Sequence, residues 1–147
     1  MKRLIFILII SGIFYGCSYD PPLPQNGKFK ITNYSKQDIF CYPSFEDNMD
    51  EIPLILNNET GKSNKFLFEI FDIPVKGSKS INGVSVWEDF INTNSKDSVI
   101  RIFIFSKALV KEYGWKNIVS TGKYTKKYVF NENQLESLNW SVFYKGY

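Results

Sequence analysis

The segment Ser98–Phe105 constrains the fold of this chain more than any other. Its side chains include Ile100, Ile102, Phe103 and Ile104, so an extended conformation would place apolar groups on both of its faces. A strand that is apolar on both faces has to be covered from both sides. We therefore expect a central strand, buried between two layers of a β-rich domain.

Five further segments have the apolar content or the alternation of β-strands. They are Phe29–Tyr34, Ile39–Tyr42, Phe66–Ile73, Lys123–Phe130 and Trp140–Tyr144. In the last of these, the two-residue period of a strand places Trp140, Val142 and Tyr144 on one face. The segments Asn57–Asn64 and Lys76–Gly83 are rich in Asn, Gly and Ser, which favours loops.

Short helices are expected between these strands. Ser85 and Glu88 have the spacing of a capping box, and Asn131–Gln134 fits a second helix start. Ser106 is a suitable N-cap for a helix over Lys107–Tyr113, which Gly114 would end in a left-handed conformation.

Together these patterns predict a mainly β fold. A chain of 147 residues is long enough for one domain, and its 44% hydrophobic and 22% charged residues exclude a disordered chain. Strands with apolar faces in a domain of this size must cover one another. We expect one globular domain over residues 28–147, an antiparallel two-layer sandwich with short helices; an immunoglobulin-like sandwich is one form it could take.

The first sixteen residues have the pattern of a signal peptide. Lys2 and Arg3 precede an apolar run from Leu4 to Tyr15. A helix of about twelve residues spans about 18 Å, which is short of the roughly 30 Å hydrocarbon core of a bilayer. The run is therefore too short for a permanent span and has the length of a signal-peptide apolar region.

Gly16 and Cys17 at the end of this run resemble the lipobox of bacterial lipoproteins. The resemblance implies cleavage between Gly16 and Cys17 and a thioether between the Cys17 thiol and diacylglycerol, which together form a lipid anchor. Residues 17–27 would then be the lipidated cysteine and a tether, which Pro21, Pro22 and Pro24 keep extended over about 30 Å. A conventional cleaved signal and an uncleaved anchor are the alternatives.

Cleavage would also change the charge of the chain. It removes Lys2 and Arg3 and no acid, so the 18 basic residues fall to 16 against 15 acidic ones. A net charge of +1 predicts no basic face, and we expect no nucleic-acid partner.

The C-terminal half resembles small uncharacterised lipoproteins of Bacteroidetes. The matching residues are Trp87–Phe90, Ile102–Phe105, Trp115–Ile118, Lys127, Tyr128, Phe130, Leu135, Leu138–Trp140, Val142 and Tyr144. The sequence departs from that pattern at Lys127, Val129 and Asn131, where the family commonly has Arg, Asp and Ser. The resemblance implies a cell-envelope lipoprotein and carries over no catalytic or binding residues.

No residue pattern indicates catalysis. Histidine is absent, which removes the commonest general base and a common metal ligand. Phosphate-binding loops and nucleophile elbows are also absent from the sequence, so we expect no catalytic residues, no metal site and no cofactor. Cys41 lies in an apolar segment and is expected to be a buried, inert thiol.

Three groups of residues nevertheless have a functional interpretation beside a structural one. Trp87, Trp115 and Trp140 are candidate ligand-contact aromatics, although core packing is the favoured interpretation. The carboxylate pairs Glu46/Asp47, Asp50/Glu51 and Glu88/Asp89 suit a glycosidase or a cation site, but a solvated surface is favoured. Arg101 is expected either to pair with a buried acid such as Glu69 or to reach the rim of the domain.

These observations favour a non-enzymatic, membrane-anchored cell-envelope lipoprotein with a binding or interaction module. Its expected contacts are the membrane, through lipid on Cys17, and an envelope protein or a glycan. The alternatives are a carboxylate-dependent polysaccharide hydrolase and a carbohydrate-binding accessory protein. We expect a lipid anchor in the cell envelope, at the periplasmic or the surface face of the outer membrane, and the sequence does not decide between the inner and the outer membrane or between the two faces.

Overall fold

The computed structural model describes residues 28–59, 61, 67–81 and 86–146. Its elements follow the order β1 (Phe29–Asn33), β2 (Ile39–Ser44), α1 (Ile52–Leu56), β3 (Phe71–Ile73), β4 (Ser78–Ile81), α2 (Trp87–Asn94), β5 (Ile100–Ser106), α3 (Lys107–Thr121), β6 (Lys126–Phe130), α4 (Glu132–Ser137) and β7 (Ser141–Tyr144). The expected signal peptide and tether, residues 1–27, lie outside the described residues.

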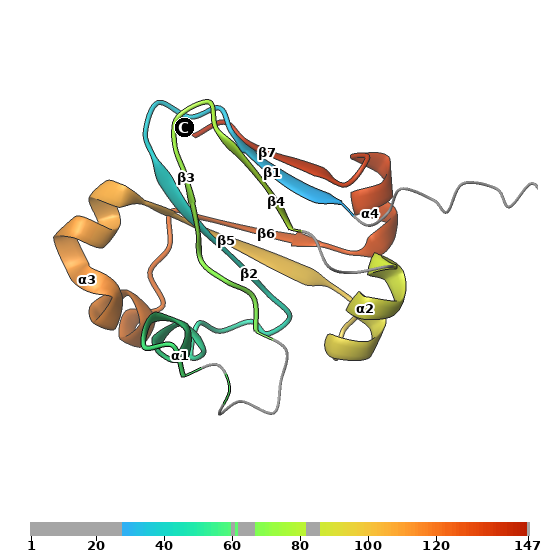
Figure 1. Cartoon of the computed structure of the whole chain (residues 1–147), viewed down its shortest axis with the longest axis horizontal. Helices are drawn as coiled ribbons and strands as arrows, with labels where there is room; N and C mark the ends of the chain where they lie inside the picture. Colours follow the sequence, from blue (N-terminus) through green and yellow to red (C-terminus); the bar gives the residue numbers. More distant parts are fainter. Residues whose placement is uncertain (1–27, 60, 62–66, 82–85, 147) are drawn as a thin grey trace, which may run out of the picture.

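The strands form two sheets, one with the order β4-β1-β7 and one with the order β3-β2-β5-β6 (Figure 1). All pairs are antiparallel except β1 and β7, which run parallel. The prediction of a mainly β, two-layer sandwich with short helices is confirmed. The immunoglobulin-like form of that sandwich stays a prediction.

The predicted central strand is β5, and every one of its seven residues is buried. Phe105 packs edge-on against Trp115 of α3, with ring centroids 5.1 Å apart, so Arg101, Phe103 and Phe105 face the helices. Because side chains alternate along a strand, Ile100, Ile102 and Ile104 face the opposite side, toward the three-stranded sheet. The four-stranded sheet is therefore covered on both faces.

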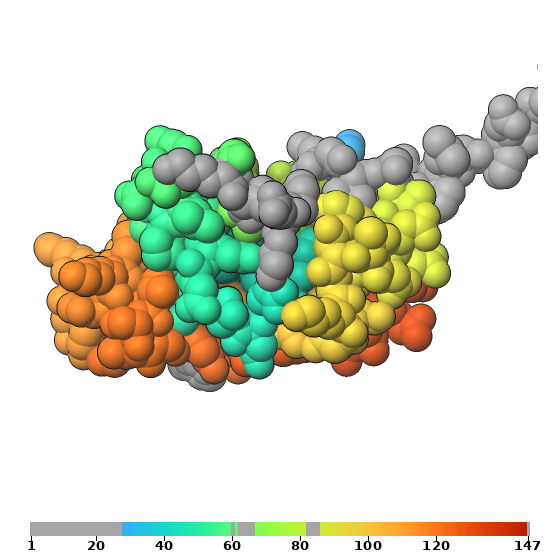
Figure 2. Space-filling model, turned by 90° about the horizontal axis from the view of Figure 1, so that it is seen from below, coloured from blue at the N-terminus to red at the C-terminus, as the bar shows by residue number. Residues whose placement is uncertain are grey.

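Helices α1 and α3 cover the side of the four-stranded sheet that faces away from the three-stranded sheet, and α2 lies at one end of the sandwich, where its Trp87 packs against Phe29 of β1. Figure 2 shows α1 and α3 side by side at one end of the domain and α2 at the other. Tyr42 of β2 donates a hydrogen bond from its hydroxyl to Glu51, which immediately precedes α1, over 2.9 Å. Phe40 of β2 packs against Trp115 of α3, with ring centroids 5.5 Å apart. These contacts fix α1 and α3 to the sheet.

Asn33, which is fully buried at the end of β1, joins the turns of the two sheets. Its side-chain amide donates to the carbonyls of Gln37, Ile73 and Pro74 at 2.9, 3.2 and 3.2 Å. Its side-chain oxygen accepts from the backbone N–H of Ser35 at 2.9 Å. A buried amide whose hydrogen-bonding capacity is used in this way stabilises one arrangement of the turns.

Two of the predicted helix starts are confirmed. Ser106 accepts a hydrogen bond from the backbone N–H of Leu109 over 3.1 Å, as an N-cap does. Asn131 and Gln134 form a reciprocal capping box at the start of α4. Helix α2 differs, because Val86 is its N-cap and no side chain caps it; Ser85 lies outside the described residues.

Three expectations about elements need correction. The first helical segment of α3 does end at Gly114, whose φ of 69° is positive as expected, but its ψ of 153° is extended rather than left-handed helical, and a second helical segment, which was not expected, follows to Thr121. Part of the predicted loop Lys76–Gly83 forms β4, since Ser78–Ile81 pair with β1. Helix α1 follows the acidic segment 46–51, with Pro53 in its first turn, and was not expected.

Candidate functional site

The three tryptophans occupy two different environments. Trp87 is 0% exposed and Trp140 is 6% exposed, and their rings stack with centroids 6.2 Å apart. Trp87 also packs edge-on against Phe29 of β1 at 5.5 Å. For these two residues core packing is confirmed. Trp115 is only partly buried, so it is the candidate ligand-contact aromatic that a solute can reach most readily.

Trp115 lines a pocket of about 360 Å³ between α1 and α3. The other lining residues are Ile52, Pro53, Leu56, Asn57, Lys116, Val119 and Ser120. Leu56 is 44% exposed at its edge. The lining is mainly apolar and includes no carboxylate, so this pocket suits an apolar or aromatic group rather than acid–base chemistry.

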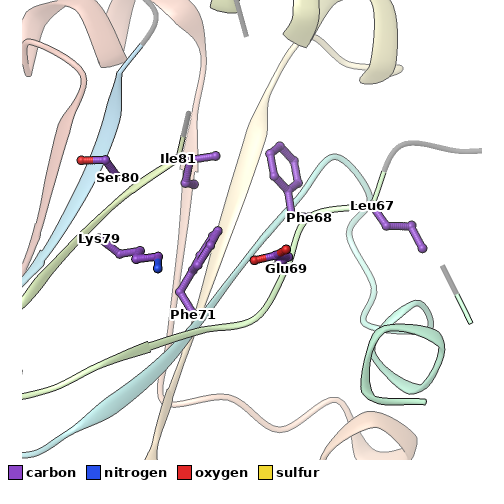
Figure 3. A pocket seen from close by; sticks show the side chains of 7 residues that line it. All are labelled: Leu67, Phe68, Glu69, Phe71, Lys79, Ser80 and Ile81. Atoms are coloured by element: carbon purple, nitrogen blue, oxygen red, sulfur yellow. The ribbon is translucent and has the colours of Figure 1, made fainter. Parts of the chain in front are cut away.

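A second pocket of about 400 Å³ lies between the segment leading into β3 and strand β4. Figure 3 shows its lining residues, with the Phe71 ring between Lys79 and Glu69. The Lys79 ammonium lies 5.7 Å from the centre of that ring. One acid and one base at the rim of an apolar floor can orient a small polar ligand, but glycosidase chemistry requires a pair of carboxylates.

A third pocket, of about 300 Å³, lies between the edge strands β6 and β7. It is lined by Tyr128, Phe130, Leu138, Ser141, Val142, Phe143 and Lys145. It contains no carboxylate. Among the described residues, none of these three pockets brings together two carboxylates.

Two members of the candidate carboxylate pairs are bound to other side chains. Asp47 accepts from the Lys127 ammonium at 2.7 Å, and Glu51 accepts from Tyr42. Within the part of the chain that the structure describes, no group of three or more Cys, Asp or Glu side chains is arranged to hold a metal ion.

A different carboxylate pair forms between α2 and α4. Partial desolvation, and then the nearby negative charge of Glu88, raise the pKa of Glu132. Glu88 and Glu132 are distant in the sequence, so no spacing rule would have paired them. Neither lines any of the three pockets described above.

Arg101 does not pair with Glu69. Its guanidinium donates to the Phe45 carbonyl at 2.8 Å and to Asp97, and lies 3.6 Å from Asp47. The hydrogen bond from Arg101 lowers the pKa of Asp97 to about 2. The side chain is 8% exposed while its acidic partners are about half exposed, so the stem is buried and the charge reaches the rim. This arrangement is structural.

The remaining titratable groups of the core are poor nucleophiles. Cys41 is fully buried, and burial raises the pKa of its thiol far above the usual range. Burial, and then the negative charge of Glu51, raise the pKa of the Tyr42 hydroxyl. Since the thiolate is the reactive form of cysteine, Cys41 is inert, as expected.

Among the described residues, no helix has both the length and the apolar character needed to span a bilayer. The chain matches no family model, no curated protein and no solved structure.

Proposed function

We propose that this protein is a lipid-anchored lipoprotein of the bacterial cell envelope, and that its β-rich domain is a non-enzymatic binding module. The observation that carries the proposal is Gly16-Cys17, placed directly after a basic start and a short apolar run. A thiol at this position is the acceptor that lipid attachment requires.

The environment of the other cysteine supports this assignment. The chain has two cysteines, and Cys41 is fully buried in β2 with its thiol protonated. A buried thiol is out of reach of an acyl-transfer enzyme, so Cys17 is the one attachment point left. The first strand begins at Phe29, which leaves residues 17–27 between the attachment point and the domain.

The pockets support binding rather than catalysis. The pocket between α1 and α3 is mainly apolar and is lined by Trp115. The pocket between residues 67–71 and β4 has one acid, Glu69, and one base, Lys79. Both have the size of small-ligand or side-chain sites. An envelope protein would insert a side chain there, and a glycan would stack on Trp115.

Metabolic labelling with palmitate tests the anchor. We expect the native chain to incorporate label that resists neutral hydroxylamine, which cleaves thioesters, and Cys17→Ser to lose both the label and the membrane fraction. Cys41→Ala is the matched control and should keep both, since its thiol is enclosed in the core. Labelling that persists in Cys17→Ser, or is lost in Cys41→Ala, would overturn the proposal.

Carbohydrate binding is the alternative that one specific observation favours, namely the partial exposure of Trp115 at the edge of a pocket. In that case Trp115→Ala should abolish retention on envelope polysaccharide, while Lys111→Ala, on the same helix but outside the pocket, should retain most of it. Equal retention by Trp115→Ala and the native chain would remove this alternative.

A further inference from the structure

Six of the fifteen lysines from Cys17 onward lie on one sheet and its turns, although the net charge gave no reason to expect a basic face. Residues 28–37, 74–81 and 141–146, which form the three-stranded sheet and most of its adjoining turns, contain six lysines and no Asp or Glu. They are Lys28, Lys30, Lys36, Lys76, Lys79 and Lys145, and all six are exposed. The acid at the end of the first turn, Asp38, accepts a hydrogen bond from the backbone N–H of Val75 and forms an ion pair with Lys107. From Cys17 onward, the rest of the chain has ten basic residues against fifteen acidic ones.

The strand register places part of this charge on one surface. Phe29, Ile31, Val142 and Tyr144 are buried toward the core, so the alternate residues face outward. Lys30 lies opposite Ser141 of β7 and Ser80 of β4, and Thr32 lies opposite Phe143 and Ser78. We call this surface the outer face; it comprises Lys28, Lys30, Tyr34, Ser78, Ser80, Ser141, Phe143 and Lys145, while Thr32 on the same side of β1 is buried.

Two exposed aromatic rings lie among these lysines. Tyr34 is 57% exposed and Phe143 is 44% exposed, and their ring centroids are 5.8 Å apart. Aromatic rings beside lysines are the combination that favours the headgroup region of a bilayer, where the ring enters the interface and the ammonium meets lipid phosphate. No described helix covers this face in Figure 1.

The chain that leads to the lipid also leaves from this sheet. Residues 17–27 join the domain at Lys28, directly before β1, the middle strand of the three. An anchor only eleven residues away keeps the outer face within tens of ångströms of the bilayer. Such a tether gives a high effective concentration, so weak attraction by a few lysines is enough to hold the face against the membrane.

We propose that the outer face docks on anionic lipid headgroups of the membrane that holds the anchor. This inference rests on the proposed lipidation of Cys17. Docking orients the domain, so that the opposite surface, with the pocket between α1 and α3, faces away from the bilayer (Figure 2).

The test uses the lipidated full-length chain in two kinds of vesicle, phosphatidylcholine alone and phosphatidylcholine with phosphatidylglycerol. Lysines are acetylated briefly with an amine-reactive ester, and the extent at each position is measured by mass spectrometry. We expect acetylation of Lys30 and Lys145 to fall several-fold on the anionic vesicles and to recover in about 0.5 M salt, because salt screens these attractions. Lys111 of α3 is exposed on another surface and should react equally on both.

A charge reversal provides the matched comparison. Lys30→Glu with Lys145→Glu should abolish the protection of the remaining outer-face lysine, Lys28, since each lysine near an anionic surface contributes roughly fivefold in affinity. Lys111→Glu with Lys116→Glu on α3 changes the net charge equally and should leave the protection intact. All four side chains are exposed, so both variants are expected to fold.

The outcomes separate this inference from the proposed function. If Lys30 and Lys145 are acetylated to the same extent on the two kinds of vesicle while the protein still floats with them, docking is overturned and the proposed lipid anchor is not. A chain that does not float with either vesicle would overturn the anchor and docking together. Protection that depends on protein concentration and occurs in detergent without vesicles would show that a second copy covers the face, and would also overturn docking.

Discussion

The two sheets of this domain differ in how they are covered. The four-stranded sheet has helices on one side and the other sheet on its second side, and its strand β5 is buried along its whole length. The three-stranded sheet is buried on one side only, and its other side carries lysines, serines and two exposed rings. The difference indicates that the four-stranded sheet supplies most of the stability, while the three-stranded sheet is free to make contacts outside the domain.

The sharpest test of this difference compares two phenylalanines. Phe103 in β5 is 1% exposed and stacks on Tyr42, whereas Phe143 in β7 is 44% exposed. We expect Phe103→Ala to lower the free energy of unfolding by about 3–5 kcal/mol and Phe143→Ala by less than about 1 kcal/mol. Denaturant unfolding followed by tryptophan fluorescence measures both. Similar losses would contradict the division between the sheets.

The packing of α3 on the four-stranded sheet depends on the kink at Gly114. Gly114 has φ 69° and ψ 153°, a backbone conformation that is nearly restricted to glycine. A Cβ there would meet no atom within 4 Å, so the cost of Gly114→Ala would come from the backbone alone. We expect a loss of about 1–3 kcal/mol.

Gly61→Ala is the matched control for the kink, since its added Cβ also meets nothing within 4 Å and its φ is not positive. It should change the unfolding midpoint little. If the two alanine variants unfold at the same denaturant concentration, α3 tolerates the kink without glycine.

The start of α3 is fixed by a single side chain. Ser106→Ala removes the acceptor for the Leu109 N–H and should lower stability by about 1 kcal/mol. Ser120→Ala in the last turn of the same helix also removes a hydroxyl, but an exposed one, and is expected to be near neutral. Thermal unfolding by circular dichroism distinguishes them, and an equal shift in Tm would refute the capping role.

The smallest expected effect concerns the ion pair at the rim of the four-stranded sheet. Because Arg101 lowers the pKa of Asp97 from 3.8 to about 2, the pair stabilises the fold above about pH 4, and this contribution is lost as the pH falls toward 2. Asp97 is about half exposed, so Asp97→Asn should cost only about 0.5–1 kcal/mol near pH 7.

The pH dependence distinguishes this effect from a general loss of stability. Unfolding curves of Asp97→Asn and the native chain should converge near pH 2. Asp50→Asn, which changes an exposed acid elsewhere, should follow the native chain at every pH. A difference between Asp97→Asn and the native chain that stays constant from pH 7 to pH 2 would contradict the assignment.

Local sequence signals predicted the parts of this fold that depend on neighbouring residues. The apolar content of Ser98–Phe105 identified the central strand, and the helix starts at Ser106 and Asn131 followed from side chains three residues from the amides that they cap. The alternation at Trp140, Val142 and Tyr144 also matched their burial. In each case the physical cause lies within one turn or one strand of the residue concerned.

Features that depend on distant partners were missed. Strand β4 has the sequence Ser-Lys-Ser-Ile, which is a strand only because β1 pairs with it. The lysines of the outer face are spread from position 28 to position 145, and pairing of β1 with β4 and β7 brings them together. Asp47 was missed as a partner of Arg101 for a similar reason, since it approaches β5 from the loop after β2. The other acidic partner, Asp97, lies only four residues before Arg101 and could have been proposed from local spacing.

The parallel pairing of β1 with β7 has a consequence for biosynthesis. Ile31 lies opposite Val142, so the middle strand of its sheet receives its second neighbour only after almost the entire chain has left the ribosome. Contacts between such remote positions form slowly, because the chain must lose the entropy of closing a long loop before the new contacts stabilise it. Under the proposed export to the cell envelope, the chain would therefore stay incompletely folded, and open to translocation, until β7 is synthesised.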